Sequence, residues 1–218
     1  MSYQIAIDGP AGAGKSTIAK KVAKTKGFIY VDTGAMYRAM AYYLLTQGID
    51  PENAEAIEAN CVNADITICY ENEEQVVLLN GENVNGVIRN EEVGNMASSS
   101  SKHPKVRERL TVLQKELAAK NNVVMDGRDI GTHVLPDADL KIYLTASAQV
   151  RAKRRYDELS AKGIPCDIEQ IEMDIIKRDE QDMNREIAPL KQAEDAVLVD
   201  SSDMTIDEVV QAILDLCR

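Results

Sequence analysis

Short runs of consecutive apolar residues alternate along the chain with longer segments in which apolar residues recur every three or four positions. The short runs, typical of strands buried on both faces, are 3–8, 28–32, 123–126, 140–144 and 196–200. The segments with helical periodicity are 16–25, 34–47, 104–121, 148–162, 168–184 and 205–216. This order predicts right-handed crossovers and an α/β fold, a five-stranded parallel sheet flanked by helices.

The segment 65–88 interrupts this rhythm. Its pattern is strand-like on both sides of Asn80-Gly81, a dipeptide suited to the two positive φ angles of a type I′ hairpin turn. No linker rich in proline or serine separates the segment from its neighbours. We therefore expect a small antiparallel β subdomain inserted into one crossover.

The charge balance excludes some classes of partner. The 218 residues include 25 Lys and Arg against 36 Asp and Glu, a net charge of −11, which opposes loose binding to nucleic acid or to an anionic membrane. Hydrophobic residues make up 44% of the chain, yet no apolar stretch approaches the ~20 residues needed to cross a bilayer. With no secretory signal at the start, the expected location is cytoplasmic.

The cysteines do not indicate a metal site. Cys61, Cys69, Cys166 and Cys217 lie far apart, and only two histidines accompany them. Reduced thiols packed as small apolar groups are expected.

The strongest local motif follows the first predicted strand. Residues 9–16 read G-P-A-G-A-G-K-S and fit the phosphate-loop pattern G-x-x-x-x-G-K-[ST]. In such a loop the backbone amides and the helix N-terminus hold phosphates, Lys15 reaches the outer phosphates, and the Ser16 hydroxyl ligates Mg²⁺. The predicted ATP-binding residues here are Gly9, Pro10, Ala11, Gly12, Ala13, Gly14, Lys15, Ser16 and Thr17.

Nucleotide binding leaves the activity open. The chain lacks the N-K-x-D and D-x-x-G elements of a GTP-driven switch. Its arginines exceed what a nucleotide pocket needs and suit a second phosphorylated substrate: Arg38, Arg107, Arg128, Arg151, Arg154, Arg155, Arg178 and Arg185. A small-molecule kinase and a nonenzymatic nucleotide sensor both remain possible at this point.

Three further segments carry a family resemblance. They are D-T-G-A-M-Y-R at 32–38, D-G-R-D-I-G-T at 126–132 and R-D-E-Q-D-M-N-R at 178–185. Together with the phosphate loop, they resemble the bacterial cytidylate kinases of the nucleoside monophosphate kinase group, over nearly the whole chain. One departure is Gln181, where some relatives carry a basic residue.

The resemblance implies a domain plan and an activity. A P-loop kinase core would comprise 1–63 and 94–218, with a monophosphate-binding insertion at 64–93 and a short lid at about 151–167. The family transfers the γ-phosphoryl group of ATP to CMP or dCMP with Mg²⁺, typically as a monomer.

The resemblance also implies roles for individual residues. Thr33, Arg38, Arg128 and Arg185 would hold phosphates, with Tyr37 lining that pocket. Ser98, Arg107 and Asp129 would read the base, Arg178 and Asp182 would face the ribose, and Arg151, Arg154 and Arg155 would close on ATP. The residues expected to act in catalysis are Lys15, Arg128, Asp129, Arg178 and Arg185.

The chemistry of cytosine agrees with this assignment of the base. Cytosine offers an amino donor at N4 and acceptors at N3 and O2, so its pocket needs a carboxylate beside hydrogen-bond donors. Asp129 supplies the carboxylate, and Arg107 and Ser98 supply donors. Uracil would set its O4 acceptor against the carboxylate, so we expect CMP to be preferred to UMP. The alternative reading of Asp129 is a helix cap or an ion-pair partner of Arg128.

Overall fold

The computed structural model describes residues 2–72 and 74–217. The chain forms two compact units, one made of residues 3–28 and 123–217 and the other of residues 29–122. Each unit is described by itself below. Among the described residues, no helix is both long enough and apolar enough to cross a bilayer.

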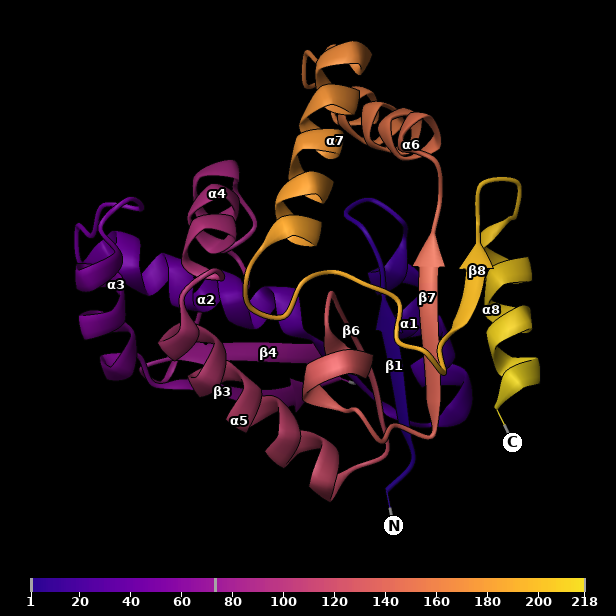
Figure 1. Ribbon diagram of the computed structural model, residues 1–218, viewed down its shortest axis with the longest axis horizontal. Helices are drawn as coiled ribbons and strands as arrows, with labels where there is room; N and C mark the ends of the chain where they lie inside the picture. Colours follow the sequence, from indigo (N-terminus) through magenta and orange to yellow (C-terminus); the bar gives the residue numbers. More distant parts are fainter. Residues whose placement is uncertain (1, 73, 218) are drawn as a thin grey trace. The chain divides into compact units, whose positions relative to one another are not determined.

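A parallel sheet has five strands in the order β2-β6-β1-β7-β8 (Figure 1). The strands are β1 (Gln4–Asp8), β2 (Ile29–Asp32), β6 (Val123–Gly127), β7 (Leu140–Thr145) and β8 (Val197–Asp200). The predicted fold class is confirmed, because all five predicted strands are present. Strand β1 pairs in parallel with β6 and with β7, so the ends of these three strands and the loops that follow them lie at one edge.

Burial of the strands follows their place in the sheet. On β1, Ile5, Ala6 and Ile7 are completely buried. On β8, Val197 and Leu198 are exposed. The prediction that this run is buried on both faces is therefore wrong, because β8 is an edge strand.

The helices of the first unit confirm the predicted segments to within one or two residues. They are α1 (Lys15–Lys26), α6 (Ala148–Ala161), α7 (Ile168–Asn184) and α8 (Ile206–Leu216). Helix α8 begins with a capping box between Thr205 and Glu208. Helices α6 and α7 pack against each other, as Figure 1 shows. A single π-helical turn, η2 (Ile130–Val134), follows β6.

The second unit contains an antiparallel sheet in the order β3-β4-β5. Asn80 and Gly81, with φ of 51° and 83°, form the expected two-residue turn, but it joins β4 (Glu74–Leu79) to β5 (Glu82–Asn83), which is only two residues long. The longer pairing lies upstream, between β4 and β3 (Ile66–Glu71). The expectation of strand-like structure through residue 88 is therefore wrong.

The second unit also contains helices, and not all of them were predicted. They are α2 (Thr33–Thr46), α3 (Ala54–Asn60), α4 (Glu91–Ser100) and α5 (Pro104–Lys120), with a 3₁₀ turn η1 (Cys61–Asn63). The sequence pattern predicts α2 and α5 but neither α3 nor α4. The Ser98–Ser101 run that ends α4 is helical up to Ser100.

Two side chains of the hairpin hold it to the rest of the second unit. Gln75 accepts from the backbone N–H of Asp32 at 2.8 Å and donates to the Asp32 carbonyl oxygen at 3.2 Å. The Tyr70 hydroxyl donates to the Tyr30 carbonyl oxygen at 3.1 Å. The hairpin thus belongs to a compact unit larger than the predicted insertion at 64–93, whose boundaries stay a prediction.

Candidate functional site

The phosphate loop joins β1 to α1. Gly9 has a φ of 150°, and a β carbon there would overlap the carbonyl oxygen of Leu144 on β7. Gly14 is left-handed, with a φ of 86°, and precedes the first residue of α1. The loop therefore requires glycine at both positions, and its backbone lies open at a helix N-terminus, where anions bind.

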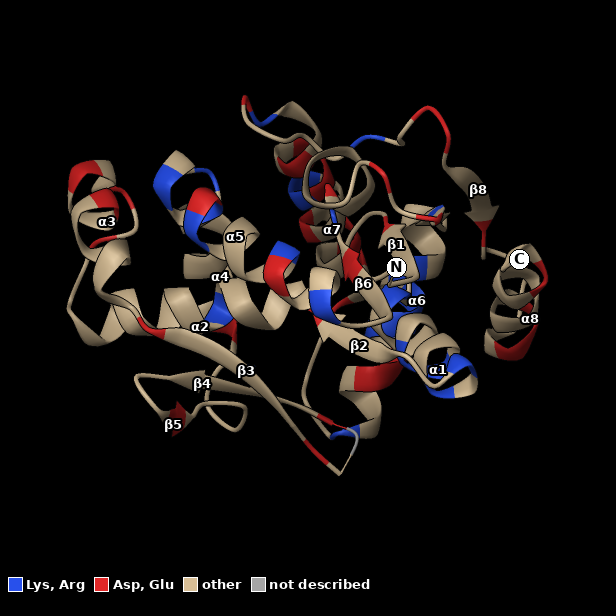
Figure 2. Cartoon of the chain, turned by 90° about the horizontal axis from the view of Figure 1, so that it is seen from below, with Lys and Arg blue, Asp and Glu red and all other residues tan. Residues whose placement is uncertain are grey.

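Lys15 begins α1 and is almost fully buried. Its Nζ donates to the carbonyl oxygen of Pro10 at 2.7 Å, across the loop. Burial, with the charge of Arg128, lowers the pKa of Lys15 to about 7, and Asp126 and Asp8 oppose the shift. Helix α1 carries five lysines and no acid, although the chain as a whole is acidic (Figure 2). This charge distribution favours a polyanionic ligand at the loop.

Ser16 connects the loop to the end of β6. Its Oγ donates to Oδ2 of buried Asp126 at 2.9 Å. Mg²⁺ is usually held by one or two protein oxygens together with substrate phosphates. The described residues contain no cluster of three or more His, Cys, Asp or Glu side chains suited to a resident metal. Ser16 and Asp126 place two oxygen atoms beside the phosphate loop, and the pair therefore fits an Mg²⁺ that is bound together with a nucleotide.

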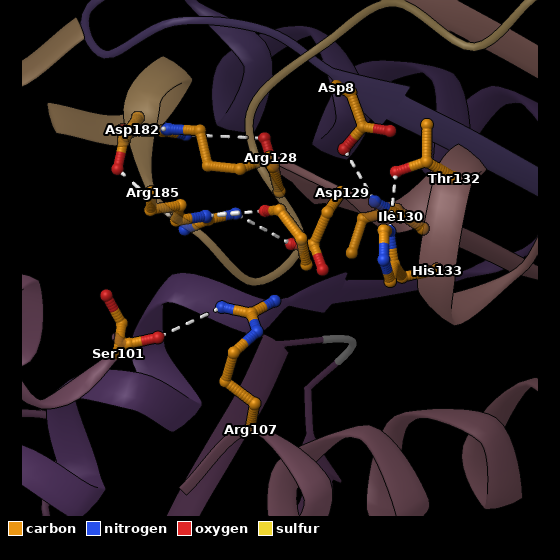
Figure 3. Close-up of polar contacts among 12 residues, drawn as sticks. Asp8, Ser101, Arg107, Arg128, Asp129, Ile130, Thr132, His133, Asp182 and Arg185 are labelled. Atoms are coloured by element: carbon orange, nitrogen blue, oxygen red, sulfur yellow. Dashed lines mark hydrogen bonds and ion pairs between the residues drawn. The ribbon is translucent and has the colours of Figure 1, made fainter. Parts of the chain in front are cut away.

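The segment after β6 lies against the end of α7. Arg128 Nε pairs with Asp182 Oδ2 at 2.9 Å, and Arg185 Nη2 pairs with Asp129 Oδ1 at 3.3 Å, as Figure 3 shows. Arg185 also approaches Asp182 at 3.9 Å. The Asp129, Asp182 and Arg185 side chains are nearly buried, so the charges interact with little screening. Four of the predicted site residues are thus brought together.

The alternative reading of Asp129, as a helix cap or an ion-pair partner of Arg128, is not confirmed. Asp129 occupies the cap position of η2, but its side chain makes no capping hydrogen bond. It has an ion-pair partner, which is Arg185. Arg178 is exposed on α7, one turn before Asp182.

The three predicted lid arginines on α6 have different surroundings. Arg151 is buried; its guanidinium pairs with Asp179 at 2.6 Å and donates to the phosphate-loop carbonyl of Ala11 at 2.9 Å. Arg154 donates to the carbonyl oxygen of Ser201 at 2.7 Å. Arg155 is half exposed and pairs with Glu158 on its own helix. Arg151 is therefore the one placed against the loop itself.

The second unit holds the other predicted residues. Thr33 begins α2 and is buried, and Arg38 donates to the carbonyl oxygens of Ile88 and Asn90 at 3.1 and 3.2 Å. Buried Arg107 donates to the Ser101 carbonyl at 3.2 Å (Figure 3) and lies 5.6 Å from the centre of the Tyr37 ring.

Ser98 lies in the last turn of α4, and its carbonyl oxygen accepts from Ser101 Oγ at 2.9 Å. Of the predicted site residues in this unit, Tyr37 and Arg107 lie beside each other.

Sequence reasoning missed Asp8, the last residue of β1. Its side chain is almost fully buried and accepts the backbone N–H of Ile130 at 2.8 Å and of Gly131 at 2.7 Å (Figure 3). Burial raises the pKa of Asp8 to about 6, and these two hydrogen bonds oppose the rise. The available signal was an acid that directly follows a buried apolar run.

Comparison with known proteins decides the family. A family model described as cytidylate kinase matches residues 5–218. The chain belongs to the cytidylate kinase family. Its relatives in this family include the cytidylate kinase of Shouchella clausii (strain KSM-K16), 51% identical over 216 residues, which are 99% of this chain and 96% of that protein. The cytidylate kinase of Alkaliphilus metalliredigens (strain QYMF) is 53% identical over 211 residues, 97% of this chain and 94% of its own length.

Solved structures support the fold. A gluconokinase from Sinorhizobium meliloti 1021 is similar with a TM-score of 0.51 at 13% identity, covering 98% of this chain and 90% of that one. A shikimate kinase from Bacteroides thetaiotaomicron has a TM-score of 0.50 at 14% identity, covering 98% and 97%. At such low identity these neighbours show that this member of the cytidylate kinase family has a P-loop kinase fold, and they carry no argument about its substrate.

Proposed function

We propose that the protein transfers the γ-phosphoryl group of ATP to CMP or dCMP, giving CDP or dCDP and ADP, with Mg²⁺. The observation that carries this proposal is the Ser16–Asp126 hydrogen bond, which joins the phosphate loop to the D-G-R-D-I-G-T segment. Through this bond, the phosphate loop lies at the same edge of the sheet as the D-G-R-D-I-G-T segment, which is characteristic of the family. The matches to cytidylate kinases over nearly the whole chain support the choice of monophosphate.

On the donor side, the loop amides and Lys15 would hold the ATP phosphates, and Ser16 and Asp126 would hold Mg²⁺, which would supply positive charge against the phosphates. An oxygen of the CMP phosphate attacks Pγ while the bond from Pγ to the β,γ-bridging oxygen breaks, and ADP leaves with those electrons. Because the attacking phosphate is already anionic, no general base is needed. Lys15, Arg128, Arg178 and Arg185 stabilise charge during the transfer.

On the acceptor side, the proposal assigns recognition of three parts of CMP. Thr33 and Arg38 take the phosphate together with Arg128 and Arg185, and Tyr37 lines that pocket. Asp129 accepts from the cytosine amino group, with Ser98 and Arg107 as donors, and Arg178 and Asp182 face the ribose. The lid role of 151–167, the closure of Arg151, Arg154 and Arg155 on ATP, and a monomeric state are parts of the same proposal.

A coupled ADP-release assay tests the function. The wild-type protein is given ATP, Mg²⁺ and, in turn, CMP, dCMP, UMP, AMP and shikimate. We expect the highest kcat/KM with CMP or dCMP. A higher value with another acceptor would identify a different small-molecule kinase, and ATP binding without turnover in any mixture would identify a nucleotide sensor.

Two variants test how the base is read. Asp129→Asn presents an amide that can donate to uracil O4, so the ratio of kcat/KM for CMP to that for UMP should fall at least about tenfold, since a hydrogen bond to a charged group contributes ~1.5–3 kcal/mol. Arg107→Ala should weaken both substrates, because O2 is common to both bases. An unchanged ratio in Asp129→Asn would remove Asp129 from base recognition.

A further inference from the structure

The turn η2 begins in an unusual way. The first amides of any helical turn have no partner inside the turn, and the side chain of the preceding residue usually accepts one of them. Asp129 holds that preceding position and has a carboxylate suited to the task. Its φ of −145° and ψ of 25° place it outside helical geometry, and its side chain makes no capping bond.

The carboxylate of Asp8, the last residue of β1, accepts these amides instead. Asp8 Oδ1 accepts from Ile130 N at 2.8 Å, and Asp8 Oδ2 accepts from Gly131 N at 2.7 Å. The parallel register explains the reach, because Asp8 lies opposite Gly127 on β6, a few residues before the turn. One oxygen for each N–H is the arrangement that suits the ionised form of Asp8.

Gly131 lies in a space with little room for a side chain. A β carbon on Gly131 would lie 3.4 Å from Asp8 Oδ2 and 3.2 Å from Cδ of Lys141. A side chain at 131 would therefore crowd Lys141 first and would lie in van der Waals contact with the Asp8 carboxylate. Glycine at this position leaves the backbone of the turn free to lie beside Asp8.

With both amides taken by Asp8, the Asp129 carboxylate is released from capping. It pairs instead with Arg185 at 3.3 Å, on the side where Arg128 and Asp182 also meet. In Figure 3 Asp8 and Arg185 approach the 128–131 segment at different residues, Asp8 at Ile130 and Arg185 at Asp129. The backbone of this segment is held from one side while its acidic side chain is presented on the other.

We infer that Asp8 is a positioning residue for base selection: it caps η2 from the neighbouring strand and thereby leaves the Asp129 carboxylate available to the cytosine amino group. This inference rests on the proposed function. It goes beyond that function by assigning a specificity role to a nearly buried residue to which the proposed function gives no part.

The test compares CMP with UMP in the Asp8→Asn variant. The new amide offers one acceptor oxygen and one NH₂ group, so one backbone N–H loses its acceptor and the Asp129 side chain becomes the nearest replacement cap. We expect the CMP to UMP ratio of kcat/KM to fall at least about fivefold. Losses of stability or of ATP binding affect both substrates alike and cancel in this ratio.

A control variant tests whether the effect is specific to Asp8, and a double variant tests whether Asp8 acts through Asp129. Asp139 accepts from the backbone N–H of Gln4 at 2.7 Å, at the opposite end of β1, so Asp139→Asn makes the same substitution at another carboxylate that accepts a backbone N–H, far from the turn, and should keep the wild-type ratio. In Asp8→Asn/Asp129→Asn, the ratio should equal that of Asp129→Asn alone, because Asp8 acts through Asp129.

Failure of the proposed function and failure of the positioning role of Asp8 give different results. A wild-type protein that does not phosphorylate CMP overturns the proposed function before any variant is made. A folded Asp8→Asn with the wild-type ratio, or a double variant whose effects simply add, overturns the positioning role alone. If Asp8→Asn does not melt cooperatively, Asp8→Ser, which retains one acceptor, replaces it with the same expected fall; failure of both to fold makes Asp8 purely structural and also overturns the inference.

Discussion

Ser16 Oγ donates to Asp126 Oδ2 at 2.9 Å, although the two residues are 110 positions apart in the chain. Ser16 is the second residue of α1, the helix after the phosphate loop, and Asp126 lies near the end of β6, the strand beside β1. A hydroxyl and a carboxylate in this relationship would offer oxygen ligands, directly or through water, to a divalent cation that binds with the nucleotide.

Substitution of Ser16 or Asp126 should change the Mg²⁺ concentration that turnover requires. Ser16→Ala and Asp126→Asn should each raise the Mg²⁺ concentration for half-maximal turnover by about tenfold, since each removes an oxygen ligand or the group that orients it. Turnover is measured against Mg²⁺ at saturating ATP and CMP. Ser16→Thr keeps the hydroxyl and serves as the control. A wild-type Mg²⁺ curve in Asp126→Asn would exclude Asp126 from the metal site.

The core and the phosphate loop could be predicted because their signals are local. The apolar run 3–8, the glycine motif and the following helical pattern are contiguous in the sequence. Helices α3 and α4 escaped prediction because they are short and polar, with Ile57 the single buried residue of α3. The exposure of Leu198 on β8 depends on its edge position, which no local pattern encodes.

The site was predicted through its motifs, whereas its supporting contacts were not. Arg151 was expected to close on ATP, yet its burial depends on Asp179, which comes 28 positions later. Asp8 was interpreted as the end of a strand because its partners, Ile130 and Gly131, are more than a hundred residues away. Long-range polar contacts of this kind carry no periodic signal in a single sequence.

The buried ion pair between Arg151 and Asp179 should matter for stability. Arg151→Met leaves a buried carboxylate whose Oδ1 already has no hydrogen-bond partner among the described residues, so we expect the free energy of unfolding to fall by about 3–5 kcal/mol. Arg155→Met, on the same helix but half exposed, should change it by less than about 1 kcal/mol. Urea unfolding measures both. Equal effects of the two substitutions would contradict the buried role of Arg151.

Asp8 should make stability depend on pH in a predictable direction. Burial raises the pKa of Asp8 to about 6, above its ordinary value of 3.8, so the folded protein binds more protons than the unfolded chain between these values. The free energy of unfolding of the wild type relative to Asp8→Asn should therefore fall as pH rises from 4 to 6, by about 2 kcal/mol. Urea titrations of both proteins across this range test it. A constant difference would show that the pKa of Asp8 is not raised.

Lys15 should take up a proton when ATP binds. Burial lowers the pKa of Lys15 to about 7 in the free protein, so at pH 8 roughly nine molecules in ten carry a neutral amine. ATP phosphates favour the charged form, and binding at pH 8 should therefore take up close to one proton. Calorimetric titration in Tris and in HEPES measures this uptake, because the apparent enthalpy then varies with the buffer's heat of ionisation. Lys15→Met should show no such uptake.

The same variant tests the role of Lys15 in the transfer. Because the ammonium stabilises charge on the outer phosphates, Lys15→Met should reduce turnover at least about a hundredfold. Thermal melting should remain cooperative, since a methionine fills the buried space without a charge. Turnover close to that of the wild type would contradict the phosphate-loop mechanism. An apparent enthalpy that is the same in both buffers at pH 8 would show that Lys15 is already protonated before ATP arrives, which would place its pKa well above 8.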